Sequence, residues 1–297
     1  MRKTYKKILI AVIVLGFLAV AANYLHHSSI AVLNPKGPVA YKERKLIFIA
    51  LALALIVVIP VYTLTILFAW RYRETNTKAK YSPELDGNKI AETIWWLIPS
   101  IIITVLAVIA WDSSHQLDPY KPLSSTTPPL TIQVVSLDWK WLFIYPQQNI
   151  ASVNLFQFPK NTPLSFELTS DSVMNSFWIP QLGGQMYVMP GMSTQLHLMA
   201  SQYGSFSGSS ANISGQGFAG MTFTAKSSSN AAFNSWVKNI KDSSSKLSMA
   251  QYNKLLQPSE YNPPSYYASA QTGLYNTIID KYLAPGGQMM GMAGMSE

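Results

Sequence analysis

The sequence predicts a membrane-anchored protein in which a helical hairpin carries an all-β domain. Two uncharged runs, residues 46–70 and 93–111, are each long enough to cross a bilayer as a helix. From residue 130 onward, apolar and polar residues alternate with a period of two, which is typical of half-buried strands. Several short strands between Gly, Pro and Ser turns indicate a small sandwich or barrel.

The first 27 residues predict either a signal peptide or a signal-anchor helix. Four basic residues within the first seven precede an uncharged run over residues 8–25. A basic start, a short apolar run and small residues are typical of a cleaved signal peptide. The run is also just long enough to span a membrane, at about 18 residues. Cleavage and retention both remain open.

Residues 28–117 form the predicted hairpin, with spans at 46–70 and 93–111. Residues 1–111 contain 13 Lys and Arg against 5 Asp and Glu. Because positively charged loops stay in the cytoplasm, the basic loop between the spans is expected there. The C-terminal domain is then expected outside the cytoplasm. Pro60 and Pro99 lie inside the spans, where neighbouring helices can satisfy the carbonyl groups that a proline leaves free.

The rest of the chain divides by composition into four segments. Residues 118–129 are a Pro-rich linker, and the β domain is expected over 130–226. Residues 227–285 are aromatic-rich and predict short helices, because apolar residues at 230–241 share one helical face. The last segment, 286–297, is rich in Gly and Met. That composition is typical of a disordered tail, although a thioether cluster can also bind Cu(I).

Composition excludes several classes of function. The chain has no Cys, so it has no disulfides, no lipid anchor through Cys and no thiolate metal site. Residues 112–297 contain nine basic and nine acidic residues, so the net charge of +8 comes from the membrane part and does not indicate nucleic-acid binding. After residue 117 the one His is His197, which lies between two Leu residues and is expected to face solvent from a strand.

Two stretches carry a resemblance to a known family. Residues 171–192 read DSVMNSFWIPQLGGQMYVMPGM, and residues 208–221 read GSSANISGQGFAGM. Together they resemble the copper-binding motifs of subunit II of the haem–copper oxidases. The positions that match the copper ligands are Asn175, Ser210, Asn212, Ser214, Phe218 and Met221, of which only the Met keeps its family residue. Without thiolate and imidazole these residues cannot hold the redox copper of that family.

The resemblance extends from about residue 34 to about residue 281. The pattern is similar to the cytochrome bo-type quinol oxidase branch, whose subunit II has lost this copper centre. It implies a cupredoxin-like Greek-key domain and a non-catalytic subunit 2 of a proton-translocating quinol:oxygen oxidoreductase. Subunits I, III and IV, membrane lipid and quinol are the implied partners. The haems and copper are expected in subunit I, with no cofactor in this chain, and the implied location is the bacterial inner membrane.

Two other functions remain as alternatives. The chain could be the electron-transfer subunit II of a cytochrome c oxidase, but the missing Cys pair counts against this. It could also be an unattached membrane-anchored binding module. Two spans with internal Pro count against that alternative, because such helices need helical neighbours.

Glu92 and two tryptophans are the remaining candidates. Glu92 could be an ordinary first-turn acid stabilised by the helix dipole. The resemblance implies instead that it stands where protons enter subunit I, because a family Glu lies seven residues before a helix Pro, as Glu92 does before Pro99. Trp139 and Trp141 belong to the run DWKWLFIYP. An equivalent run carries electrons in copper-bearing relatives, but without copper we expect the two tryptophans to pack in the core.

Overall fold

The computed structural model describes residues 30–77, 87–242 and 245–283, together with helical residues at 16, 20 and 23. The chain divides into two compact units, one over residues 42–121 and one formed by the sequence on either side. Apart from those three helical residues, the predicted signal or anchor segment 1–27 lies outside the described residues. The predicted tail 286–297 also lies outside them.

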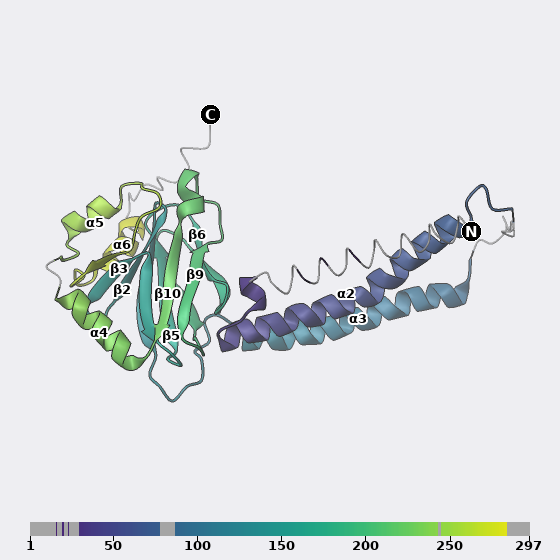
Figure 1. Cartoon of the computed structure of the whole chain (residues 1–297), viewed down its shortest axis with the longest axis horizontal. Coiled ribbons are helices and arrows are strands. Elements are labelled where there is room, and N and C mark those ends of the chain that lie inside the picture. The colour runs from purple at the N-terminus through teal and green to yellow at the C-terminus, as the bar shows by residue number, and fades with distance from the viewer. Residues whose placement is uncertain are drawn as a thin grey trace. The chain divides into compact units, whose positions relative to one another are not determined.

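Two long helices form the first unit. Helix α2 spans Pro38–Arg71 and helix α3 spans Lys89–Gln116, and both are long and apolar enough to cross a membrane. The helices extend beyond the predicted spans 46–70 and 93–111 because their charged and polar flanks continue the helical turns. Figure 1 shows the two helices as an antiparallel pair, and Lys42 donates to the Gln116 side chain where the two ends meet (3.4 Å).

The polar groups of these helices are largely satisfied within the helices. The hydroxyl groups of Thr65 and Ser100 donate to the carbonyls of Val61 and Trp96, four residues earlier (2.8 and 2.7 Å). Such bonds let a hydroxyl enter a bilayer without water. Pro60 and Pro99 lack an N–H group, so each leaves one carbonyl of its helix without its usual partner.

The second unit is a β-sandwich of two mixed sheets, which confirms the predicted fold class. The six-stranded sheet has the order β11-β3-β2-β1-β5-β8. Its strands are β1 Leu130–Leu137, β2 Lys140–Tyr145, β3 Ile150–Val153, β5 Leu164–Ser170, β8 Thr194–Leu198 and β11 Ser265–Tyr267. The five-stranded sheet has the order β4-β10-β9-β6-β7. Its strands are β4 Leu155–Pro159, β6 Asn175–Ile179, β7 Gly183–Val188, β9 Gly204–Ser210 and β10 Thr222–Ser228.

An aromatic core fills the space between the sheets. Phe177 of β6 stacks on Phe223 of β10 with ring centroids 5.0 Å apart. Trp141 of β2 meets both rings edge-on, at 5.4 and 5.7 Å. Edge-to-face and stacked pairs of this kind stabilise a core beyond the area that they bury. The core therefore ties a strand of one sheet to two strands of the other.

A second apolar cluster covers the outer face of the six-stranded sheet. It joins residues of β1, β2 and β3 to the C-terminal segment, through α5 Met249–Leu255 and α6 Leu274–Leu283. Helix α4 Asn230–Lys241 of the same segment packs instead against the first core, through Phe233 and Ile240. Figure 1 shows these helices on the side of the sandwich where β2 and β3 lie. Strand β11, from within the predicted segment 227–285, pairs with β3 and joins the sheet. The C-terminal segment is therefore part of the sandwich and not a separate appendage.

The chain just before the membrane also packs on the sandwich. Lys36 donates its N–H to the carbonyl of Gln181 (2.7 Å) and accepts at its own carbonyl from the N–H of Ser201 (2.7 Å). A Cβ at Gly37 would lie 2.2 Å from the carbonyl oxygen of Met199. The approach is so close that only glycine fits at this position. The turn-rich connector at 34–38 is thus held firmly against two loops of the β domain.

Candidate functional site

The first candidate site lies where β6 begins and β9 ends. Asn175 is the first residue of β6 and Ser210 is the last residue of β9, and the two strands are antiparallel neighbours in the five-stranded sheet. Both side chains are almost fully buried, with exposed fractions of 1% and 4%. The fold thus brings together the two motifs that the sequence singled out, although they lie 35 residues apart.

A hydrogen-bond network occupies these positions. The Ser210 hydroxyl accepts from the N–H groups of Ser176 (3.3 Å) and Asn212 (3.4 Å). Two acceptors lie 3.0 Å from the same hydroxyl, the side-chain oxygen of Asn175 and the carbonyl of Asn212. The hydroxyl has one proton, so it donates to only one of them at a time. The amide groups of Asn175 and Asn212 in turn donate to the carbonyls of Val173 (3.1 Å) and Met174 (3.0 Å). Hydrogen bonds therefore join the polar groups at the positions that match the copper ligands of the family in the sequence resemblance.

Ser214, Phe218 and Met221 lie in the connection between β9 and β10. The Ser214 hydroxyl is 3.9 Å from the sulfur of Met221, which is fully buried. Phe218 lies on the 3₁₀ helix η2 Gln216–Gly220 and is half-buried. These three residues therefore add to the site one hydroxyl, one phenyl ring and one thioether that already contacts the hydroxyl. None of the three is a strong copper ligand.

Trp139 packs against the connection between β9 and β10. It sits in the turn between β1 and β2 with a left-handed backbone (φ 60°). Its indole N–H donates to the carbonyl of Ser214 (3.2 Å). A Cβ at Gly217 would lie 2.3 Å from the indole ring, so the ring and the glycine backbone are in direct contact. The tryptophan thus holds the connection between β9 and β10 in place.

The donor set does not fit a dinuclear copper centre. Amides, hydroxyls and one thioether are present, whereas such a centre is built on thiolate sulfur with imidazole support. Within residues 30–77, 87–242 and 245–283, no group of three or more His, Cys, Asp or Glu could hold a metal ion.

His197 lies on β8 of the other sheet, paired in register with Ser165, and is half-buried. It lies on a strand as expected, and its partial burial lowers the pKa of the imidazole.

Trp141 and Lys140 point to opposite faces of β2. Trp141 is fully buried between the sheets, and its indole N–H has no hydrogen-bond partner among the described residues. Lys140 is only 2% exposed and faces the C-terminal segment, where it donates to the carbonyls of Leu255 (2.9 Å) and Gln257 (2.7 Å). Burial lowers the pKa of Lys140, and nearby Asp138 opposes that shift. Sequence reasoning missed Lys140, because no local pattern shows which carbonyls a buried Lys will meet.

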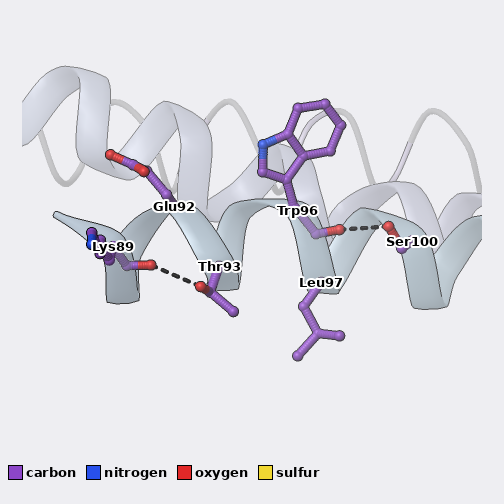
Figure 2. A pocket seen from close by; sticks show the side chains of 6 residues that line it. All are labelled: Lys89, Glu92, Thr93, Trp96, Leu97 and Ser100. Atoms are coloured by element: carbon purple, nitrogen blue, oxygen red, sulfur yellow. Dashed lines mark hydrogen bonds between the residues drawn. The ribbon is translucent and has the colours of Figure 1, made fainter. Parts of the chain in front are cut away.

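The second candidate site is the first part of α3. Asn88 caps the helix by accepting from the N–H groups of Ile90 (3.0 Å) and Ala91 (3.1 Å). Glu92 follows in the first turn and is exposed in this chain. An open hollow runs along one side of the helix and is lined by Lys89, Glu92, Thr93, Trp96, Leu97 and Ser100. Figure 2 shows Glu92 and Trp96 projecting in the same general direction, one turn apart.

Comparisons with known proteins agree along most of the chain. The family model "Cytochrome C oxidase subunit II, transmembrane domain" matches residues 35–112, and the model for the periplasmic domain matches residues 147–228. The model "COX Aromatic Rich Motif" matches residues 241–286, which include α5, β11 and α6.

Curated relatives include quinol oxidase subunits from several bacteria. The chain is 52% identical to cytochrome bo(3) ubiquinol oxidase subunit 2 of Pseudomonas aeruginosa, over 84% of this chain and 75% of that protein. It is 51% identical to ubiquinol oxidase subunit 2 of Acetobacter aceti, over 93% of this chain and 90% of that protein. A structural match is the periplasmic domain of cytochrome oxidase subunit II of Bradyrhizobium japonicum, with 22% identity, a TM-score of 0.37 and coverage of 40% of this chain and 96% of that one.

Proposed function

Because the chain belongs to the ubiquinol oxidase subunit 2 family, we propose that it is the copper-free, membrane-anchored subunit of a complex that oxidises quinol and reduces oxygen to water. In this proposal the complex also moves protons across the membrane. The haems, the active-site copper and the quinol site belong to subunit I. This chain contributes no catalytic residue and serves to stabilise and cover its partner.

One observation carries this proposal. The positions that match copper ligands are joined by hydrogen bonds among Asn175, Ser210 and Asn212, with no thiolate or imidazole in the set. A sandwich without a redox centre cannot relay electrons from a soluble donor. Electrons must then reach subunit I from a donor that binds there, and quinol in the membrane is such a donor. The alternative, an electron-transfer subunit of a cytochrome c oxidase, is not favoured for the same reason.

The helical unit supports an assembly in the membrane. None of the most apolar part of α2 or α3 is buried within this chain, so lipid or other helices must cover it. Arg71 ends α2 and Arg73 follows in the loop, and this basic pair favours the cytoplasmic side. We assign the chain to the bacterial inner membrane, with the sandwich outside the cytoplasm and subunits I, III and IV as its partners.

Glu92 is the residue that we assign to proton uptake. It lies in the first turn of α3, on the end that we assign to the cytoplasmic side because of the basic loop, and it is exposed in this chain. Thr93, Trp96 and Ser100 lie along the same hollow and offer a face that a helix of subunit I could cover. A carboxylate held there can exchange protons with the cytoplasm and deliver them to the partner.

Purification of the complex in mild detergent tests the proposal. The full-length chain should copurify with haem-bearing partners, and the complex should consume oxygen with quinol and not with reduced cytochrome c. A complex that used only cytochrome c would contradict the proposed donor. A chain that emerged folded but free of haem-bearing partners would contradict the proposed assembly.

A further inference from the structure

A buried carboxylate joins the sandwich to its C-terminal segment. Asp171 follows β5, and its side chain is 1% exposed. One carboxylate oxygen accepts from the hydroxyl of Tyr252 (2.6 Å). The other accepts from the hydroxyl of Tyr282 (2.6 Å) and forms an ion pair with Lys281 (2.7 Å). Three donors therefore converge on one acid, and all three come from helices at the other end of the chain.

The donors suit a negatively charged acceptor. Burial and the negative charge of Asp171 raise the pKa of Tyr252 and Tyr282 well above the ordinary value for tyrosine. Both hydroxyls therefore keep their protons and remain donors at any physiological pH. Hydrogen bonds to an ionised acceptor are roughly twice as strong as those between neutral groups. Lys281 adds a positive charge to the same carboxylate oxygen that Tyr282 contacts.

Lys140 provides a second charged link on the same side of the sandwich. Its ammonium group is buried against the carbonyls of Leu255 and Gln257, at and just beyond the end of α5. Helix α5 is thus held through Tyr252 by an acid of the sandwich and at its end by a base. Among the described residues, Asp171 and Lys140 do not form an ion pair with each other. Each is satisfied by the C-terminal segment instead.

The loop that begins with Asp171 also reaches the copper-equivalent network. The hydroxyl of Ser170 lies 3.0 Å from the carbonyls of both Ser172 and Val173. At the far end of the loop, the carbonyls of Val173 and Met174 accept from Asn175 and Asn212. The side chains of Val173 and Met174 are each 42% exposed. One short loop therefore connects the C-terminal helices to an exposed surface beside the first candidate site.

We propose that Asp171 is a charge-dependent clasp through which α5 and α6 position the loop 171–174. The clasp couples the C-terminal segment to the surface formed by Val173 and Met174. Without the negative charge, α6 detaches locally and the loop becomes mobile while the aromatic core of the sandwich stays intact. This device is separate from proton uptake at Glu92 and requires no cofactor in this chain.

Hydrogen exchange in the purified complex tests the clasp. Asp171→Asn keeps the shape of the side chain but removes its charge. We expect amide exchange in residues 274–283 and 171–175 to accelerate roughly tenfold or more, as loss of one charge-assisted hydrogen bond implies. Exchange in β2 and β6 should stay within about twofold of wild type. The double variant Tyr252→Phe, Tyr282→Phe keeps the rings packed and should reproduce the effect even if Asp171→Asn fails to assemble.

Asp280→Asn is the matched control, because it neutralises an exposed acid next to Lys281 and removes none of the clasp bonds described above. It should leave exchange unchanged in both regions. The proposal is overturned if the Asp171 or double-tyrosine variants exchange like wild type in residues 274–283. It is also overturned if the helix loosens while the loop does not, or if β2 and β6 loosen as much as α6.

Discussion

Truncation of Trp141 separates a packing role from an electron-transfer role. The side chain is fully buried against Phe177 and Phe223, and its removal leaves a cavity between the two sheets. Replacing a buried Trp by Ala costs about 3–5 kcal/mol. For a domain of this size, each 1 kcal/mol lowers the melting temperature by roughly 2–4 °C. Trp141→Ala should therefore lower the melting temperature of the sandwich by roughly 6–20 °C.

Trp141→Phe gives a sharper comparison. The indole N–H has no hydrogen-bond partner among the described residues, and an unsatisfied buried donor costs about 1–3 kcal/mol. Phenylalanine removes that donor and leaves only a small cavity, so the two changes in free energy largely cancel. We expect Trp141→Phe to unfold within about 1 kcal/mol of wild type.

Thermal unfolding of the purified complex and oxygen consumption per haem check both variants. Trp141→Ala should reduce the yield of assembled complex but leave turnover per haem close to wild type. A collapse of turnover in fully assembled, haem-replete enzyme would refute the packing role of Trp141. Equal destabilisation of the sandwich by Trp141→Phe and Trp141→Ala would refute it as well.

Three further predictions concern single residues. Glu92→Gln should slow quinol oxidation per haem while assembly and haem content stay intact, and Glu92→Asp should have a milder effect. Equal rates in wild type and Glu92→Gln would leave Glu92 as a first-turn acid. Its interaction with the helix dipole would then stabilise the chain by under about 1 kcal/mol. Gly217→Ala should cost about 1–3 kcal/mol in unfolding free energy, because its Cβ meets the Trp139 ring. In a chain that also carries Trp139→Ala, most of that cost should disappear. If the costs of the two substitutions simply add, the contact between them is excluded. Burial lowers the pKa of His197, so the unfolded chain takes up a proton more readily and stability falls as pH drops through about 6.5. The melting temperature of His197→Gln should therefore differ less between pH 7 and pH 5 than that of wild type. An equal difference in the two proteins would show that His197 is not the cause.

The fold was predictable where the pattern of residues is local. The uncharged runs indicate α2 and α3, and the alternation around Leu164, Phe166 and Leu168 indicates β5, whose three apolar side chains are all buried. The burial of β2 on both faces was not predictable, because its outer face is covered by a segment more than 100 residues later. The same holds for Lys140, whose acceptors lie 115 and 117 residues away.

The candidate site was predictable only in part. The motifs around Asn175 and Ser210 indicate that the two residues meet, since the resemblance places both at one site. The hydrogen bonds of Ser210 to Asn175 and Asn212 depend on side-chain geometry that no spacing encodes. The clasp at Asp171 was missed because its three donors come from helices 81 to 111 residues later. No local sequence pattern links an acid after a strand to tyrosines so distant.

The most direct test of the central claim is copper binding by the full-length chain in detergent. We expect no stoichiometric copper and no thiolate–copper absorption when copper is supplied, because the positions that match the copper ligands hold amides and hydroxyls. A chain carrying Asn175→His, Ser210→Cys, Ser214→Cys and Phe218→His together is the positive control, and no single one of these changes should suffice. A coloured, stoichiometric copper centre in the unaltered chain would contradict the account.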